Sequence, residues 1–260
     1  MKYTKLLTVL LGAGLWISCD KDDDDHYPPH NEVKATVVKS AGDLTSALAE
    51  FRALLGEPLN TTPNQTAGRR EVNWDGVPAN LSNNDLFPLD FFNNTDSAGP
   101  NGRKRGLVYA NNGAKFRIDT SAYIDIEPTY ANNFKAFSPR RLVTAINTNV
   151  SEVIFKVPGT NTDAFVKGFG LVFSDVDNGD YTTVEFYNGN KSLGTFKAPA
   201  RTDANGHSFL GVYFPEEKVT RVKIVAGNGV LNGQKDITDG GQKDLVVFDD
   251  FFYNEPVAKN

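Results

Sequence analysis

The chain has 260 residues, a formal net charge of −5 and one cysteine, Cys19. A chain of this length can bury a large hydrophobic core, and a single cysteine leaves no internal disulfide to support it. Without residues 1–18, which carry Lys2 and Lys5, the charge is −7, and the run 20–25 accounts for −4 of it. The remainder is nearly balanced, which argues against a nucleic-acid partner.

The first 18 residues have the pattern of a secretory signal. Two lysines precede LLTVLLGAGLWI, residues 6–17, an apolar run shorter than the roughly 20 residues that span a bilayer as a helix. Ser18 and Cys19 follow, an arrangement that resembles a bacterial lipobox, although Trp16 stands where such boxes usually hold leucine. We expect cleavage before Cys19 and lipidation of its thiol, which would anchor the chain in a membrane. An ordinary signal with an unmodified cysteine is the alternative.

Residues 19–35 are predicted to form a tether. The run DKDDDD, residues 20–25, repels itself and stays solvated, while Pro28 and Pro29 stiffen the part that follows. A cysteine followed by a cluster rich in Lys and Asp also resembles the surface-export signal of Bacteroidetes lipoproteins. That resemblance implies an outer-membrane lipoprotein facing the cell exterior, whereas the residues alone indicate only a flexible tether.

One amphipathic helix is predicted at about 43–55. Asp43 can cap its start, and Gly56 and Pro58 end it. Its apolar residues fall on one stripe, which consists of Leu44, Ala47, Leu48, Phe51, Leu54 and Leu55. This stripe should pack against the body of the protein, and we expect residues 36–260 to form a single domain.

Short strands follow the helix, and several alternate apolar with polar residues, as half-buried antiparallel strands do. They are predicted at 70–74, 106–110, 114–118, 152–157, 165–173, 182–187, 193–198, 207–214, 219–226 and 244–253. Residues 188–190, Asn-Gly-Asn, form a hairpin turn signal. Strands at this spacing predict an all-β fold, an antiparallel β-sandwich or jelly roll with one N-terminal helix. Residues 81–105 should form a long ordered loop over it, and such loops often carry function.

Several stretches together resemble a known family. They are FRALLG (51–56), GRREVNWDGVP (68–78), FSPRRLVTAI (137–146), FKVPGT (155–160), VKGFGLVFSDVD (166–177), HSFLGVYF (207–214), RVKIVAGN (221–228) and VVFDDFFYNEP (246–256). They resemble an uncharacterised β-domain family of secreted bacterial proteins, some with PEP-CTERM sorting tails, over roughly residues 42–256. The resemblance implies one extracytoplasmic β domain and no reaction, and this chain departs from those relatives in its lipid-anchor signal and its lack of such a tail.

The later strands also resemble a carbohydrate-binding module or a galactose-binding-like domain. In such domains a closing strand of the form VVFDDFFY, residues 246–253, is common. The similarity concerns architecture, and a fold by itself does not define a function.

Few residues are candidates for catalysis. Two of the three histidines lie in the tether and His207 is expected at the surface, so a Ser-His-Asp triad is not indicated. With Cys19 lipidated, no thiol serves catalysis or zinc binding. Carboxylate pairs such as Asp249 and Asp250 could serve a glycosidase, but neighbours on a strand point to opposite faces and should not line one cleft. We expect no enzymatic activity, with a glycan-processing hydrolase as the alternative.

A structural calcium ion suits the acidic residues better than catalysis does, because Ca²⁺ binds carboxylates and carbonyl oxygens. In binding modules of the kind just named, a closing-strand aspartate often meets an N-terminal loop at such an ion. This resemblance implies a site at Asp249 or Asp250 together with Asp75. The segment 175–185, DVDNGDYTTVE, superficially resembles an EF-hand loop, but its glycine and its glutamate each fall one position early. We therefore expect it to be a strand-to-turn connection capped by its aspartates.

Trp74 and Asp75 of the NWDG stretch are candidate ligand-binding residues, since an exposed tryptophan can stack on a sugar. A packing role for Trp74 is the alternative. Asp96-Ser97-Ala98 resembles a Bacteroidetes O-glycosylation motif, which makes Ser97 a candidate site. Together these features predict a cell-surface lipoprotein with a non-catalytic binding or adhesion domain, whose partner is an extracellular glycan or a surface protein. A structural envelope protein without a small ligand is the third possibility.

Overall fold

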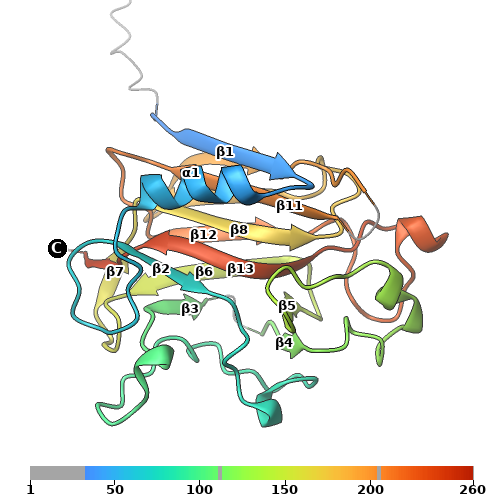
Figure 1. Ribbon diagram of the computed structural model, residues 1–260, viewed down its shortest axis with the longest axis horizontal. Coiled ribbons are helices and arrows are strands. Elements are labelled where there is room, and N and C mark those ends of the chain that lie inside the picture. The colour runs from blue at the N-terminus through green and yellow to red at the C-terminus, as the bar shows by residue number, and fades with distance from the viewer. Residues whose placement is uncertain (1–32, 111–112, 204–205, 260) are drawn as a thin grey trace, which may run out of the picture. The chain divides into compact units, whose positions relative to one another are not determined.

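In the computed structural model, residues 33–110, 113–203 and 206–259 are described, and they fold as a β-sandwich with one helix (Figure 1). The two sheets are antiparallel and have seven strands each, which confirms the predicted fold class. The predicted signal peptide, Cys19 and the acidic run lie outside the described residues. Within those described ranges, no helix has the length and apolar character needed to cross a bilayer.

The first sheet has the strand order β1-β11-β8-β13-β5-β4, with β2 also paired to β13. Its strands are β1 (Thr36–Ala41), β2 (Arg69–Val72), β4 (Phe116–Asp119), β5 (Leu142–Ala145), β8 (Gly168–Ser174), β11 (His207–Tyr213) and β13 (Val247–Asn254). The second sheet has the order β10-β9-β12-β6-β7-β14, with β3 paired to β6. Its strands are β3 (Leu107–Tyr109), β6 (Val150–Lys156), β7 (Asp163–Phe165), β9 (Thr183–Asn188), β10 (Lys191–Lys197), β12 (Arg221–Val225) and β14 (Val257–Ala258).

Loops carry four short 3-10 helices, η1 (Ala79–Leu81), η2 (Asn101–Arg103), η3 (Pro128–Asn132) and η4 (Ile237–Asp239). The predicted strand 165–173 is two strands, because the chain crosses from β7 in the second sheet to β8 in the first. Val166 still bridges to Val219 in the second sheet, and the first sheet begins at Gly168. Only Lys167 and Gly168 separate the apolar residues on the two sides of this change of sheet, so the sequence does not mark the boundary clearly.

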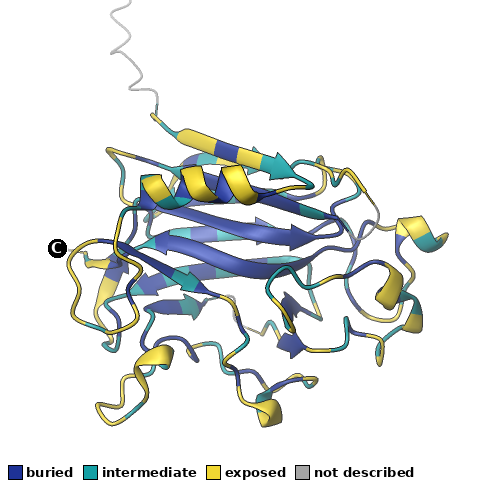
Figure 2. Cartoon of the chain, viewed as in Figure 1, coloured by how far each residue is buried: buried dark blue, intermediate teal, exposed yellow. Residues whose placement is uncertain are grey.

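The helix α1 (Thr45–Leu55) packs on the outer face of the first sheet, and Figure 2 shows its exposed side turned away from buried strands. Ala47, Leu48, Phe51 and Leu55 are buried, as the predicted stripe requires. The carboxylate of Asp43 accepts the Thr45 amide at 2.9 Å and so supports the first turn. The sandwich therefore has a third layer on one side.

Two glycines make room for this helix. Gly170 of β8 and Gly211 of β11 are register partners, and a Cβ atom at either would lie 2.7 Å from a carbon of the Phe51 ring. The ring is fully buried against the sheet and meets Phe209 edge-on, with 5.4 Å between centroids. Glycine is needed here for the close approach of a side chain rather than for a turn.

The segment 81–105 is an ordered loop, as predicted. Phe87, Phe91 and Phe92 are buried, and the rings of Phe92 and Trp74 lie 5.3 Å apart in an edge-on arrangement. The loop therefore extends the hydrophobic core between the sheets and has a rigid base.

We expect Gly211→Ala to lower the free energy of unfolding by about 1–3 kcal/mol, because the added methyl group overlaps the Phe51 ring. Urea denaturation measures the change. Gly76→Ala is the matched control, since a Cβ there meets no atom within 4 Å. The double variant with Phe51→Leu should show a coupling energy that offsets part of the loss. Equal effects at positions 76 and 211 would contradict the packing argument.

Candidate functional site

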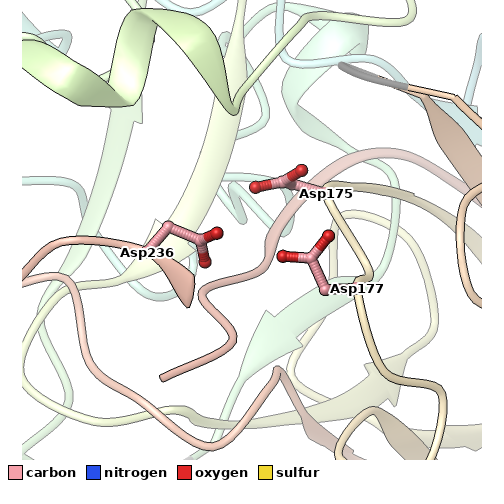
Figure 3. Close-up of side chains that lie close together, drawn as sticks. All are labelled: Asp175, Asp177 and Asp236. Carbon is pink, nitrogen blue, oxygen red and sulfur yellow. The ribbon is translucent and has the colours of Figure 1, made fainter. Parts of the chain in front are cut away.

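Three aspartates meet at one end of the sandwich (Figure 3). Asp175 and Asp177 directly follow β8, and Asp236 precedes η4 in the connection between β12 and β13. One oxygen of each carboxylate lies within 4.8 Å of the others, and Figure 3 shows the three groups directed toward one another. Among the residues that the structure describes, this is the only group of three or more metal-ligating acids this close together. We call it the aspartate triad.

The triad is buried. Asp175 and Asp236 are 0% exposed, and the side chain of Asp177 is 14% exposed. Asp175 has a φ of 71°, in the left-handed region, which an aspartate tolerates better than most residues. This backbone conformation ends β8 and begins the turn that carries Asp177 into the triad.

Backbone groups hold Asp236 in place. Its Oδ1 atom accepts the amide and the hydroxyl of Thr238 at 2.9 and 2.7 Å, and its Oδ2 atom accepts the Leu245 amide at 2.8 Å. The two bonds from Thr238 use both lone pairs of Oδ1, whereas Oδ2 accepts one bond and keeps a lone pair for a further partner. A cation could therefore bind Asp236 without breaking these bonds.

The other two aspartates share one arginine. The Nε atom of Arg201 lies 2.9 Å from Asp175 Oδ1 and donates to Asp177 Oδ1 at 2.7 Å. The contact between Arg201 and Asp175 is an ion pair by distance but lacks hydrogen-bond geometry, so Asp175 Oδ1 accepts no hydrogen bond. Asp177 Oδ2 also accepts no hydrogen bond. Both atoms are out of contact with solvent. Two buried carboxylate oxygens in the triad are thus unsatisfied.

A fourth aspartate adds to the negative charge. Asp244 is buried and accepts the Asn178 amide at 2.9 Å, which ties it to the same turn. Four carboxylates then stand beside one guanidinium, an excess of three formal negative charges. Burial raises the pKa of Asp175 to about 8 and that of Asp244 to about 6, although Arg201 opposes the shift at Asp175 and backbone amides oppose it at Asp244. The pKa of Asp177 is also raised, first by burial and then by Asp236.

This arrangement has two ways to relieve the repulsion. The carboxyl groups can take up protons, or a cation can enter and bind the unsatisfied oxygens. Carboxylate oxygens are hard ligands that suit Ca²⁺ or Mg²⁺. The triad could therefore hold a metal ion.

The sequence prediction for the segment 175–185 was incomplete. The segment is a connection after a strand, as expected, and does not form an EF-hand loop. However, Asp175 and Asp177 are directed into the triad rather than serving only as caps, and Asp236 joins them from 59 positions farther along the chain than Asp177. A pair of aspartates spaced by two at the end of a buried strand was the available signal, while the partner could not be found without the fold.

The predicted calcium residues lie elsewhere. Asp249 and Asp250 are buried in β13, and Asp75 is near Arg140 and Arg141, whose charges act against the burial that raises its pKa. Asp75, Asp249 and Asp250 do not approach one another as closely as the triad does.

Asp249 and Asp250 share a partner, contrary to the expectation that neighbouring residues on a strand point apart. The Ser138 hydroxyl lies 3.0 Å from Asp249 Oδ1 and 2.7 Å from Asp250 Oδ1. The reason is a register shift between Phe248 and Phe251, which breaks the alternation of β13 at these two residues. Burial, and then the neighbouring carboxyl group of Asp250, raises the pKa of Asp249 far above its usual range.

Trp74 is 1% exposed, so its ring faces pack inside the protein, and its indole N–H donates to the Asp249 carbonyl at 2.9 Å. This is the packing role considered as the alternative. Ser97 is exposed in a turn closed by a bond from the Gly99 amide to the Asp96 carbonyl, an accessible position for modification. His207 is half-buried rather than fully at the surface, because its Nε2 atom lies 2.9 Å from the Lys135 carbonyl.

Comparisons with models of protein families, with curated proteins and with solved structures find no match to this chain. The resemblance to the secreted β-domain family therefore stays a prediction, and the functional argument rests on the site itself.

The buried carboxyl pair makes stability depend on pH. In its metal-free state, the folded protein holds protons at Asp249 that the unfolded chain releases above about pH 4. The free energy of unfolding should thus fall as the pH rises from about 5 to 9, by up to about 1.4 kcal/mol per pH unit for each such proton. Asp249→Asn, which resembles the protonated acid, should flatten this dependence in denaturation curves recorded with a chelator. The exposed control Asp90→Asn should leave it unchanged, and an equal slope in Asp249→Asn and the parent would contradict the assignment.

Proposed function

We propose that this protein is a non-catalytic binding module of the cell surface whose loop end is stabilised by a bound calcium ion. The aspartate triad is the observation that carries the proposal. Its residues supply three carboxylates, two of which have an oxygen without a hydrogen-bond donor in a buried position. Buried charges in proteins are paired or coordinate metals, because an isolated buried carboxylate is strongly disfavoured.

Calcium suits the triad better than magnesium. Ca²⁺ accepts six to eight oxygen ligands in flexible geometry, whereas Mg²⁺ demands a near-ideal octahedron. The triad takes its three carboxylates from two connections and has Arg201 and Asp244 beside it, a ligand set that suits the flexible coordination of Ca²⁺. An ion there would join the turn after β8 to the connection before β13.

Such an ion would order loops rather than perform chemistry. Loops on a rigid sheet carry recognition in many sandwich domains, and holding them in one conformation lowers the entropic cost of binding a partner. This favours a binding or adhesion role, with an extracellular glycan or a surface protein as the partner.

The single carboxylate of the cavity beside Trp74 supports a non-catalytic role for that cavity. A glycosidase needs two carboxyl groups facing a cleft, one of them protonated. In the cavity beside Trp74, Glu71 is the one lining carboxylate, and it accepts from Arg52 at 2.9 Å and from Arg69 at 2.8 Å. Burial opposes ionisation of Glu71, but the two arginines outweigh it and lower the pKa of Glu71. Glu71 is thus held as a structural anion and is a poor proton donor.

The location at the cell surface is proposed from the sequence. A short apolar run ends at Cys19, and an acidic run follows it. A lipid at Cys19 would tether the folded domain outside the cell. Extracellular calcium-binding modules have dissociation constants of about 0.1–1 mM for the ion.

Calcium should raise the melting temperature of the parent protein and a chelator should lower it. At a concentration 100-fold above its dissociation constant, the ion would stabilise the fold by about 2.7 kcal/mol. Asp175→Asn should abolish this gain, because it removes a charged ligand of the triad. With the chelator present, Asp175→Asn should be at least as stable as the parent at neutral pH, because the parent must take up a proton at Asp175 on folding, whose pKa is raised to about 8, and asparagine needs none.

Asp249→Asn is the matched control for the calcium experiment, because it also neutralises a buried aspartate but lies outside the triad. It should keep the full calcium response. The calcium proposal fails if calcium does not stabilise the parent. It also fails if calcium stabilises Asp175→Asn as strongly as the parent. Mg²⁺ in place of Ca²⁺ should give a smaller shift.

Cys19→Ser tests the lipid anchor. In a bacterial host, the parent should be recovered with the outer membrane and should carry acyl chains detectable by mass spectrometry, whereas Cys19→Ser should not be acylated. Retention of Cys19→Ser in the membrane by an unacylated N-terminus, or an unmodified thiol in the parent, would contradict the proposal.

A further inference from the structure

A cavity of about 370 Å³ lies beside Trp74, between the loop 81–105 and the chain that follows β2. Its size is near the lower end of the range of small-molecule sites. Its apolar wall includes Pro78, Phe91, Phe92 and Pro100, and it also contains the charged side chains of Glu71, Arg103 and Arg105. This is the loop in which the sequence predicted function, and the cavity is separate from the aspartate triad.

The side chain of Arg103 lacks a hydrogen-bond partner within the described residues. Its guanidinium carbon lies 4.3 Å from the centre of the Phe91 ring, and its Nε atom is buried without an acceptor. Within the described part of the chain, this guanidinium forms no ion pair and donates no hydrogen bond, and it stacks on the Phe91 ring. A buried N–H that the protein leaves unpaired, on a side chain lining a cavity, indicates an acceptor supplied from outside.

Arg105 is a second cation in the same wall. Its Nε and Nη1 atoms donate to the carbonyls of Gly102 and Asn60 at 3.3 and 2.8 Å, which fix the side chain without neutralising its charge. The only anion among the lining residues, Glu71, is already neutralised by Arg52 and Arg69. The cavity therefore has a net positive charge.

We propose that this cavity binds a uronate, the carboxylate-bearing form of a hexose, either free or as the terminal residue of an acidic glycan. The proposal names a ligand class for the binding function proposed above and adds a site separate from the calcium site.

Each part of the ligand has a counterpart in the cavity. The planar guanidinium of Arg103 forms paired hydrogen bonds with a carboxylate, and its stacking on Phe91 fixes the plane in which those bonds are made. The apolar wall lowers the local dielectric constant and so strengthens the contact between charges. The exposed side chains of Pro78 and Pro100 provide surfaces for the apolar face of a pyranose ring, whereas the rings of Phe91 and Phe92 are buried. The small volume favours a single sugar residue over a longer chain buried along its length.

The test is a calorimetric titration of the full chain with D-galacturonate and D-glucuronate, and with galactose and glucose as neutral counterparts. At least one uronate should bind, and its neutral counterpart should bind at least tenfold more weakly, because it lacks the group that pairs with Arg103. Trigalacturonate distinguishes the two sources: tighter binding than the monosaccharide indicates a glycan end, and equal or weaker binding indicates a free uronate.

Arg103→Gln should weaken uronate binding by tenfold or more, and Arg103→Lys should retain part of the affinity because it keeps the charge but not the paired donors. Arg221→Gln is the control, since Arg221 also stacks on an aromatic ring, Tyr187, but lies on β12 and does not line this cavity. Melting curves of all variants, recorded with and without calcium, distinguish a loss of uronate binding from a loss of folding or of calcium binding. The proposal is overturned if no uronate binds the folded parent, if neutral sugars bind as tightly, or if Arg103→Gln binds as the parent does.

Discussion

An excess of buried negative charge governs the end of this sandwich. Asp175, Asp177, Asp236 and Asp244 stand beside one cation, Arg201, and solvent does not reach most of their oxygens. Removing a carboxylate from water costs several kcal/mol unless the charge is paired. A proton can neutralise one carboxylate at a time. A divalent ion would neutralise several carboxylates at once and would also join the two connections that carry the aspartates. The metal-free and metal-bound states therefore differ in how firmly the loops are held.

Strand β13 links this end to the rest of the molecule. It pairs with β8, β5 and β2, and Leu245, two residues before it, donates its amide to Asp236. Its carbonyl at Asp249 accepts from Trp74, which forms part of the cavity wall. One central strand thus contacts the residues that position both candidate sites. A change in the packing of β13 would therefore reach both of them.

Local features of the structure were predictable, and long-range ones were not. The helix and most strands follow from periodicity, but β1, β5 and β14 were missed because TVVKSA, LVTA and VA are short and have no clear alternating pattern. The bulge at Phe248/Phe251 contradicted the rule of alternating faces because it depends on pairing with β8. The aspartate triad combines segments far apart in sequence. A buried Trp74 and an unpaired Arg103 likewise depend on how the loop 81–105 folds back on β2.

Burial decides what a cation can do here. In a site where an ion bridges the protein and an acidic ligand, the ion must keep coordination positions open to solvent. Asp175 and Asp236 are 0% exposed and Asp177 is nearly enclosed, so an ion held by them has little access to a glycan. A carboxylate-bearing ligand would also be repelled by the surplus charge of the triad and attracted to Arg103 and Arg105. Under the two proposals, the sites would have separate roles: a cation at the triad would fix the scaffold, and the guanidinium groups of Arg103 and Arg105 would bind the ligand.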